Sequence, residues 1–205
     1  FFSICTRTAL VPSLPLCYDK EKKEVGSMPF EFAFLDWLLQ FHTPTMDALA
    51  VFFNYAGAHG EIWIALTLIL LFSRRTRRAG LAMALALGLY MITGHFLLKP
   101  LFARPRPCDL NKAVTLLVPR PNGYSFPSGH TSSAFAAAWA LFRNDRQLGI
   151  PALVLAACIG FTRLYLYVHF PTDVLGGIVF GIVLGILGDL LADKLAKFCK
   201  KKQIV

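Results

Sequence analysis

The chain has 205 residues, of which 56% are hydrophobic and 16% are charged, and its mean hydropathy is +0.55. A soluble domain averages about 45–50% apolar and about 25% charged residues, so this composition indicates a membrane protein. The formal net charge of +9 could suit a nucleic-acid-binding protein. The basic residues lie between apolar runs, however, which favours membrane-flanking loops and no nucleic-acid partner. The five scattered cysteines form no CxxC pair, so they predict neither a zinc site nor a disulfide framework.

Residues 1–27 are mixed in character, begin with Phe1 and end near a charged run at 20–24. We interpret 1–27 as a leader or remnant outside the fold and place the membrane domain at 28–205. A secretory signal peptide is the alternative. The basic residues follow the apolar stretch here, whereas in a signal peptide they precede it.

Aromatic residues and leucines surround Glu31 and Asp36 in the segment 28–40. Thirteen residues are too few for a span, which needs about 20, so we predict a helix lying at the membrane interface. Residues 45–57 are apolar but interrupted by Asn54, which predicts a short span or part of a tilted one.

The rest of the chain contains clearer apolar runs at 62–72, 81–98, 131–142, 152–168 and 174–191. Several fall short of 20 residues, so the spans extend into flanking residues or some helices are shielded by their neighbours. We therefore predict an all-α fold, a polytopic transmembrane bundle of five or six membrane helices with an N-terminal interfacial helix. Glycines spaced four apart in the last run predict close helix packing, with a homodimer as the alternative.

Basic clusters follow alternate runs and therefore share one side of the membrane: 74–78, 143–146 and 194–202. The positive-inside rule makes that side cytoplasmic. The loop 99–130 and the turn 169–173 then face the periplasm or exterior of a plasma-membrane protein.

Three cations mark the outer ends of these runs: Lys99, Arg106 and Arg163. Arg163 lies five residues before the end of its run, about 8 Å deep at 1.5 Å per residue. A cation at that depth is costly unless it snorkels to the headgroups or meets an anion. A guanidinium matches phosphate oxygens bidentately, and a lysine adds a point charge.

Ser128, Gly129 and His130 directly precede an apolar run, which places them at the start of a helix. Free N–H groups and the helix dipole attract anions there, and Gly129 allows a close approach of the backbone. An ordinary serine cap is the alternative.

His169 and Asp173 are four residues apart, across a turn that contains Pro171. A carboxylate beside an imidazole fixes its tautomer and leaves the other ring nitrogen free to attack phosphorus. An interfacial histidine next to a capping aspartate is the alternative. With the cations and the helix start on one membrane face, the set matches what phosphoryl transfer requires. No cluster of carboxylates accompanies it, so we expect no metal and no cofactor, and we interpret His95 as structural.

These motifs closely resemble the type 2 phosphatidic acid phosphatase superfamily, whose pattern is K-x6-RP, PSGH and SR-x5-H-x3-D. The sequence reads Lys99-x6-Arg106-Pro107, then 127–130 as PSGH, then Thr162-Arg163-x5-His169-x3-Asp173, with Thr162 in the place of the usual serine. The resemblance implies a phosphohistidine on His169, which Asp173 orients, and a proton donated by His130. It also implies that the phosphoryl oxygens are bound by Lys99, Arg106, Ser128, Gly129 and Arg163, without a metal.

The resemblance implies a lipid phosphatase, and we favour undecaprenyl diphosphate because the chain is similar to small bacterial members. Phosphatidylglycerophosphate, phosphatidic acid and lipid A phosphate are the rival substrates. A vanadate-dependent haloperoxidase shares the motifs, but those enzymes are soluble and larger. A transporter or lipid-binding protein without enzymatic activity is the remaining alternative.

Overall fold

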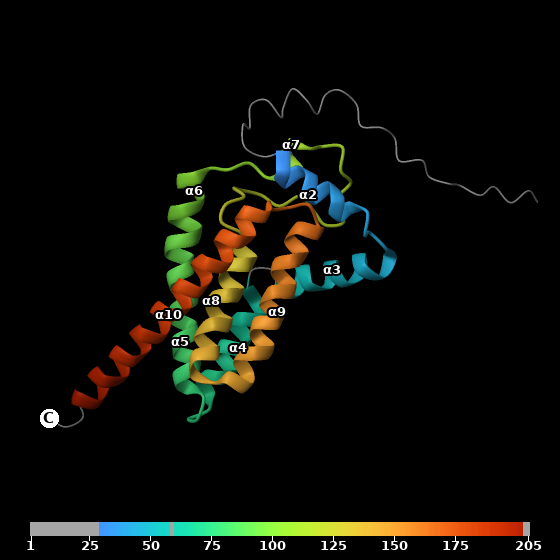
Figure 1. Ribbon diagram of the computed structural model, residues 1–205. Helices are drawn as coiled ribbons and strands as arrows, with labels where there is room; N and C mark the ends of the chain where they lie inside the picture. The colour runs from blue at the N-terminus through green and yellow to red at the C-terminus, as the bar shows by residue number, and fades with distance from the viewer. Residues whose placement is uncertain (1–28, 58–59, 203–205) are drawn as a thin grey trace, which may run out of the picture.

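A computed structural model describes residues 29–57 and 60–202, and the expected leader 1–27 lies outside them. All secondary-structure elements of the described part are helices, as predicted, and it has no strand. Its elements are α2 (Pro29–Leu39), α3 (Pro44–Ala56), α4 (Glu61–Phe72), α5 (Arg77–Tyr90), the π-helix η2 (Met91–Leu98), α6 (Lys99–Phe102), α7 (Pro107–Leu110), α8 (Gly129–Asn144), α9 (Arg146–Tyr165) and α10 (Pro171–Lys202). Figure 1 shows α4, α5, α8, α9 and α10 side by side in one bundle, with α2 lying across its upper end.

Three helical segments are long and apolar enough to cross a membrane: Arg77–Leu110, Arg146–Tyr165 and Pro171–Cys199. Helices α3 and α4 pass the same test together as one broken span bent by 52°, which would make four. The multi-pass character is confirmed, and the count of five or six membrane helices is not. Helix α8 has 16 residues, about 24 Å of helix, which is short of the roughly 30 Å of bilayer hydrocarbon.

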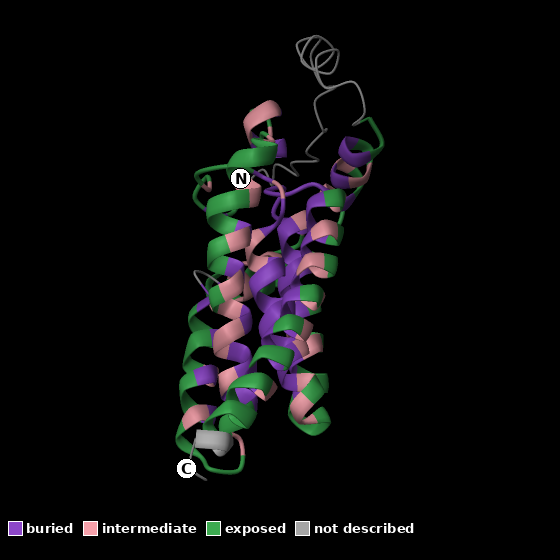
Figure 2. Cartoon of the chain, turned by 90° about the vertical axis from the view of Figure 1, so that its left-hand side faces the viewer, coloured by how far each residue is buried: buried purple, intermediate pink, exposed green. Residues whose placement is uncertain are grey.

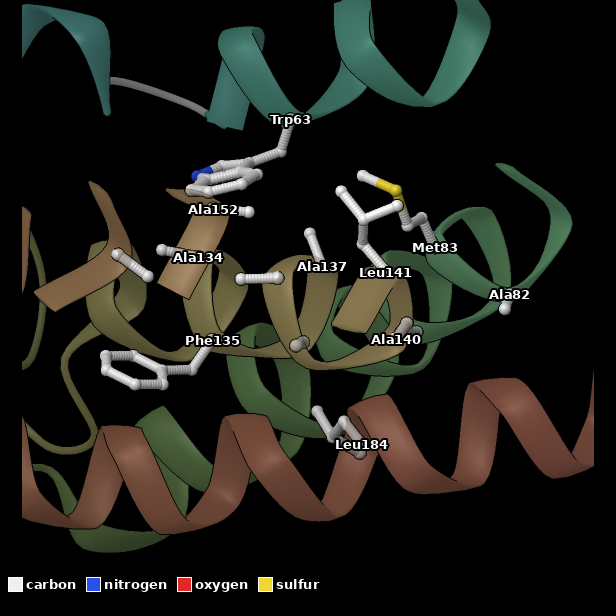
Figure 3. Close-up of a cluster of buried hydrophobic side chains, with 14 of the residues drawn as sticks. Trp63, Ala82, Met83, Ala134, Phe135, Ala137, Ala140, Leu141, Ala152 and Leu184 are labelled. Atoms are coloured by element: carbon white, nitrogen blue, oxygen red, sulfur yellow. The ribbon is translucent and has the colours of Figure 1, made fainter. Parts of the chain in front are cut away.

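Helix α8 forms the centre of the bundle. Its alanines at 134, 136, 137, 138 and 140 have no exposed surface, and a helix that is apolar all round is one buried by its neighbours. Figure 2 shows this buried column between the outer helices. Trp63, Met83 and Leu184 pack around it from α4, α5 and α10 (Figure 3). The short run at 131–142 is thus shielded by other helices.

The glycines of α10 allow this packing. A Cβ added at Gly181 would lie 2.6 Å from the Ser132 carbonyl oxygen and 2.8 Å from the Phe135 Cβ. Gly177 and Gly185 meet the same helix at 3.1 and 2.8 Å. The predicted close packing of helices is therefore confirmed within the chain.

The two ends of the bundle differ in character. At one end, a carboxylate with 4% side-chain exposure, Asp189 of α10, binds Arg78 of α5 at 3.1 Å and Arg143 of α8 at 2.7 Å. The α4–α5 connection and the α8–α9 turn lie at this lower end in Figure 1, whereas α2, α6 and α7 lie at the other end. Basic residues from two of the predicted clusters therefore share one end of the molecule.

Candidate active site

The three sequence clusters meet at the end of the bundle opposite Asp189, around a cavity of about 550 Å³. Six of the eight predicted site residues line it: Lys99, Arg106, Gly129, His130, Arg163 and His169. The remaining two, Ser128 and Asp173, are completely buried and bond to residues next to the lining. Part of its wall is apolar, formed by Ile64, Leu87 and Met91. The cavity thus has both charged and apolar walls.

His169 is held in a turn between α9 and α10. Tyr167 adopts a left-handed backbone with φ of 60°, which turns the chain sharply after α9. Its hydroxyl donates to Asp36 of α2 at 2.7 Å and accepts from Asn111 at 3.2 Å. These bonds fix the turn, and His169 is only 2% exposed.

The two ring nitrogens of His169 have different surroundings. On one side, Nδ1 lies 3.5 Å from Asp173 Oδ2 and 3.3 Å from Ser125 Oγ. Ser125 donates to the same carboxylate oxygen at 2.5 Å, and the Phe170 backbone N–H donates to it at 2.8 Å. On the other side, Nε2 lies 3.0 Å from Arg106 Nη1. An Nδ1–H directed toward the carboxylate leaves the lone pair on Nε2.

Burial is the main cause that lowers the pKa of His169 to about 4. The Asp173 carboxylate acts in the opposite direction and raises that pKa, while the Arg106 charge lowers it further. The imidazole is therefore neutral at pH 7, which is the state that a nucleophile requires. Ser125 was missed from the sequence, although it lies only three residues before Ser128.

Arg106 is 4% exposed and holds the loop at the cavity mouth. Its Nε donates to the Gly123 carbonyl at 2.9 Å, and Nη2 donates to the carbonyls of Asn122 and Tyr124 at 3.3 and 3.4 Å. Nη1 donates to the Val168 carbonyl at 3.1 Å and faces His169 Nε2. All five N–H donors of the guanidinium thus have protein partners, and one of these partners is His169 Nε2.

Arg163 is 2% exposed, and its donors are only partly used. Nη1 donates to Asn54 Oδ1 at 2.8 Å, and Nη2 donates to Thr162 Oγ1 at 3.0 Å. Nε is buried and has no hydrogen-bond partner among the residues that the structure describes. Buried donors are nearly always paired, so an unpaired one beside a cavity indicates a site for an acceptor such as a phosphate oxygen. Thr162, which stands where the family pattern has serine, still supplies a hydroxyl to Arg163. The same hydroxyl donates to the Ile159 carbonyl at 2.8 Å.

The start of α8 forms the floor of the cavity. Ser128 is the N-cap, and its backbone N–H donates to the Asp173 carbonyl at 3.1 Å. A Cβ added at Gly129 would lie 2.7 Å from the Tyr90 hydroxyl and 3.6 Å from Lys99 Nζ, so a larger residue there would displace the Tyr90 hydroxyl. Lys99 and the free N–H groups of the helix start therefore face the same space, which favours an anion.

Three further residues contribute in ways that the sequence did not predict. Asn54, interpreted as an interruption of an apolar run, holds Arg163. Arg104 donates from Nη1 to Asp173 Oδ1 at 2.5 Å, although it appeared only as a variable position within the K-x6-RP motif. His95, interpreted as structural, is exposed and lines the cavity. Within residues 29–57 and 60–202, no group of three or more His, Cys, Asp or Glu side chains could hold a metal ion.

The fold and the site define a helical membrane protein in which a buried histidine–carboxylate pair lies beside a cavity lined by Lys99, Arg106 and Arg163. The sequence model of the PAP2 superfamily matches residues 77–194, more than half of the chain, so the chain belongs to the PAP2 superfamily.

Several relatives are named for the compounds they act on. The undecaprenyl-diphosphatase of Sulfolobus acidocaldarius is 31% identical over 134 residues, 65% of this chain and 64% of that protein. Undecaprenyl-diphosphatase BcrC of Bacillus subtilis is 30% identical over 69% of this chain and 72% of its own length. Decaprenylphosphoryl-5-phosphoribose phosphatase of Mycobacterium tuberculosis is 34% identical over 66% of this chain and 74% of its own length.

Two solved structures share the fold. The crystal structure of a transmembrane PAP2-type phosphatidylglycerolphosphate phosphatase from Bacillus subtilis has a TM-score of 0.68 and 26% identity. The match covers 86% of this chain and 92% of that one. The crystal structure of Aquifex aeolicus LpxE has a TM-score of 0.64 and 30% identity, and the match covers 79% and 96% of the two chains. The family and the names of these relatives support a phosphatase.

Proposed function

We propose that the protein hydrolyses a lipid phosphate or diphosphate without a metal, through a phosphohistidine on His169, at the outer face of the membrane. The observation that carries this proposal is the asymmetry of His169. Its Nδ1 faces Asp173 and Ser125, while its Nε2 lies 3.0 Å from Arg106 at the wall of the cavity. A neutral imidazole held in this way presents a lone pair toward the space that a phosphoryl group would occupy.

In the first step, Nε2 of His169 attacks phosphorus. The N–P bond forms as the bond from phosphorus to the leaving oxygen breaks, and His130 donates a proton to that oxygen. Asp173 stabilises the positive charge that develops on the imidazole. Arg163 and Arg106 bind the phosphoryl oxygens. The Nη1–H group of Arg106 that lies at His169 Nε2 in the structure turns to the phosphate.

In the second step, His130 takes a proton from water as the water oxygen attacks phosphorus. The N–P bond breaks, its electron pair returns to Nε2, and inorganic phosphate leaves. His130 is thereby protonated again for the next cycle. Lys99, Arg106 and Arg163 supply the positive charge around the transition state that metal ions supply in other phosphatases.

We also propose a topology of five crossings, by α4, α5, α8, α9 and α10, within a membrane domain that begins at residue 28. Helix α2 then lies at the outer interface beside the site. The support is that Arg78 and Arg143 bind Asp189 at the opposite end, which the positive-inside rule assigns to the cytoplasm. The short helix α8 is surrounded by the other helices and need not match the bilayer by itself.

Undecaprenyl diphosphate is the proposed substrate, because two relatives matching about two thirds of this chain are named undecaprenyl-diphosphatases. The apolar wall at Ile64, Leu87 and Met91 offers a polyprenyl chain a contact surface in the same cavity as the cations. Phosphatidylglycerophosphate is the second candidate, since the phosphatidylglycerolphosphate phosphatase from Bacillus subtilis has the same fold.

The test is phosphate release by purified wild type and His169→Ala from undecaprenyl diphosphate, phosphatidylglycerophosphate, phosphatidic acid and lipid A. We expect wild type to prefer undecaprenyl diphosphate and the variant to release nothing above background. When the reaction with phosphate-labelled substrate is stopped early, the wild-type protein should carry an acid-labile labelled phosphate. The His169→Ala protein should carry none. Release by the variant at the wild-type rate would overturn the mechanism, and preference for another lipid would overturn the substrate.

A further inference from the structure

We propose that Glu31 of α2 acts through Arg104 as a positioning group for the His169–Asp173 pair, so that helix α2 completes the active site. This inference rests on the proposed function. It concerns a helix outside residues 77–194, the part of the chain that matches the family.

A continuous set of bonds joins α2 to the catalytic pair. Arg104 donates from Nη1 to Asp173 Oδ1 and from Nη2 to Glu31 Oε2, both at 2.5 Å. The other oxygen of Glu31 accepts from the Thr172 backbone N–H at 3.1 Å and from its hydroxyl at 2.5 Å. Arg104 also donates to that hydroxyl at 2.7 Å. Glu31 thus holds both the cation that contacts Asp173 and the residue next to Asp173.

Both oxygens of Asp173 are fixed by these contacts. Oδ2 accepts from Ser125 and from the Phe170 backbone N–H, and it is the oxygen 3.5 Å from His169 Nδ1. Oδ1 has Arg104 as its partner. Rotation of the carboxylate would break bonds on both sides, so the orientation of His169 depends on Arg104 as well as on Asp173.

The three charges are shielded from water, with side-chain exposures of 17% for Arg104, 9% for Glu31 and none for Asp173. Burying such charges costs free energy that their mutual attraction offsets only in part, so stability alone is a weak reason for this arrangement. Low exposure also strengthens their electrostatic effect on the neighbouring imidazole.

Apolar contacts hold α2 in this place. Phe32 packs edge-on against Phe170 with ring centroids 5.2 Å apart, and the Arg104 guanidinium lies 4.3 Å from the centroid of the same Phe170 ring. Leu35 is completely buried, whereas Phe30 and Trp37 are 78% and 49% exposed. Helix α2 therefore buries one face on the site and presents aromatic side chains on another. Figure 1 shows it crossing above the ends of α9 and α10.

Opposite charges on Arg104 and Glu31 give a test that a merely structural role would not pass. Arg104→Gln removes a positive charge near His169, so the pKa of His169 should rise and the acid limb of kcat/KM should move to higher pH. Glu31→Gln removes a negative charge, so the limb should move to lower pH. We expect shifts of about half to one pH unit in each single variant, and in the double variant an acid limb at a pH close to that of wild type.

The other charged or titratable groups that face His169 are the same in every variant: Lys99, Arg106, His130, Arg163 and Asp173. The ionisation of the substrate is also the same, so the difference between profiles reports the changed residue. Each single variant should lower kcat about tenfold or more, because the carboxylate is less well oriented. Arg104→Lys should keep the acid limb of wild type while losing part of kcat, since the charge remains and the fork is lost.

Asp36→Asn is the matched control on the same helix. Asp36 accepts from the Tyr167 hydroxyl at 2.7 Å, whereas Glu31 binds Arg104 and Thr172. If Glu31 served only to dock α2, then Asp36→Asn would have the same effect as Glu31→Gln. We expect the control to lower the temperature of unfolding in detergent and to leave the acid limb in place.

The outcomes separate this inference from the proposed function. A wild-type protein that releases no phosphate from any lipid of the panel would overturn the proposed function and this inference with it. An active wild type whose limb moves in the same direction in Arg104→Gln and Glu31→Gln, or does not move, would overturn only the positioning role. If Arg104→Gln does not fold, the contrast between Glu31→Gln, Arg104→Lys and Asp36→Asn decides.

Discussion

Replacement of Arg163 by lysine is the sharpest test of the oxyanion pocket. The guanidinium has five N–H donors, of which one goes to Asn54 and one to Thr162. The donor on Nε and one on each terminal nitrogen remain for a phosphoryl group in the adjoining cavity. A lysine ammonium keeps the charge, but it cannot bind two phosphoryl oxygens side by side while it also keeps Asn54 and Thr162 as partners.

Loss of a single oxyanion-stabilising donor typically lowers kcat by about 10²–10³, equivalent to about 2.7–4 kcal/mol of transition-state stabilisation. We expect Arg163→Lys to fall in this range, with a smaller change in KM, because the fork matters most as negative charge spreads over the oxygens. The assay is steady-state phosphate release in detergent micelles, with His169→Ala as the background.

Asn54→Ala is the control, because it leaves the guanidinium in place and removes only one of its supports. It should lower kcat by about tenfold, less than Arg163→Lys does. A variant with lysine at 163 that keeps kcat within about threefold of wild type would refute the assignment of Arg163 to the phosphoryl oxygens. The unpaired Nε would then be a structural feature only.

Three further predictions concern protonation, packing and metals. Because burial lowers the pKa of His169 from about 6.5 to about 4, the folded state resists protonation that the unfolded state accepts, and stability should fall as pH drops from about 6.5 toward 4. A histidine NMR titration, assigned with His169→Ala, should show a midpoint near 4, and a midpoint near 6.5 would contradict the burial argument. Gly181→Leu should destabilise the bundle by about 1–3 kcal/mol or more in thermal unfolding, since even a Cβ would lie 2.6 Å from the Ser132 carbonyl oxygen. Gly88→Leu, where a Cβ meets nothing within 4 Å, should cost far less, and equal losses would count against close packing as the cause. Phosphate release should be unchanged by EDTA, and a loss that added Mg²⁺ restores would contradict a pocket that relies on protein cations.

Much of the site could be predicted from local sequence. The spacing of His169 and Asp173 requires only one turn and the start of a helix, and the structure places Nδ1 and the carboxylate 3.5 Å apart. The position of Ser128 before an apolar run likewise fixes it as the N-cap of α8. Such features depend on a few neighbouring residues, so the pattern of the sequence is sufficient to define them.

Long-range partners could not be predicted in this way. Asn54 and Arg163 are 109 positions apart, and Glu31 and Arg104 are 73 apart. No periodicity connects such residues, because their contact depends on how α2 and α3 dock on the ends of the bundle. The number of spans was equally hard to predict, since α8 is short and polar at its start and is covered by neighbouring helices.

By itself, the sequence determined that this is a helical membrane protein with the motifs of the PAP2 superfamily at one end of its helices. Hydrophobic runs and motif spacings are local properties, and the bilayer restricts such runs to helices because every backbone polar group must be paired within the segment. The tertiary structure alone decided that the buried Nε of Arg163 has no described partner and which residues hold the His169–Asp173 pair. Those properties depend on packing between distant segments, as in the contact of Arg104 with both Glu31 and Asp173.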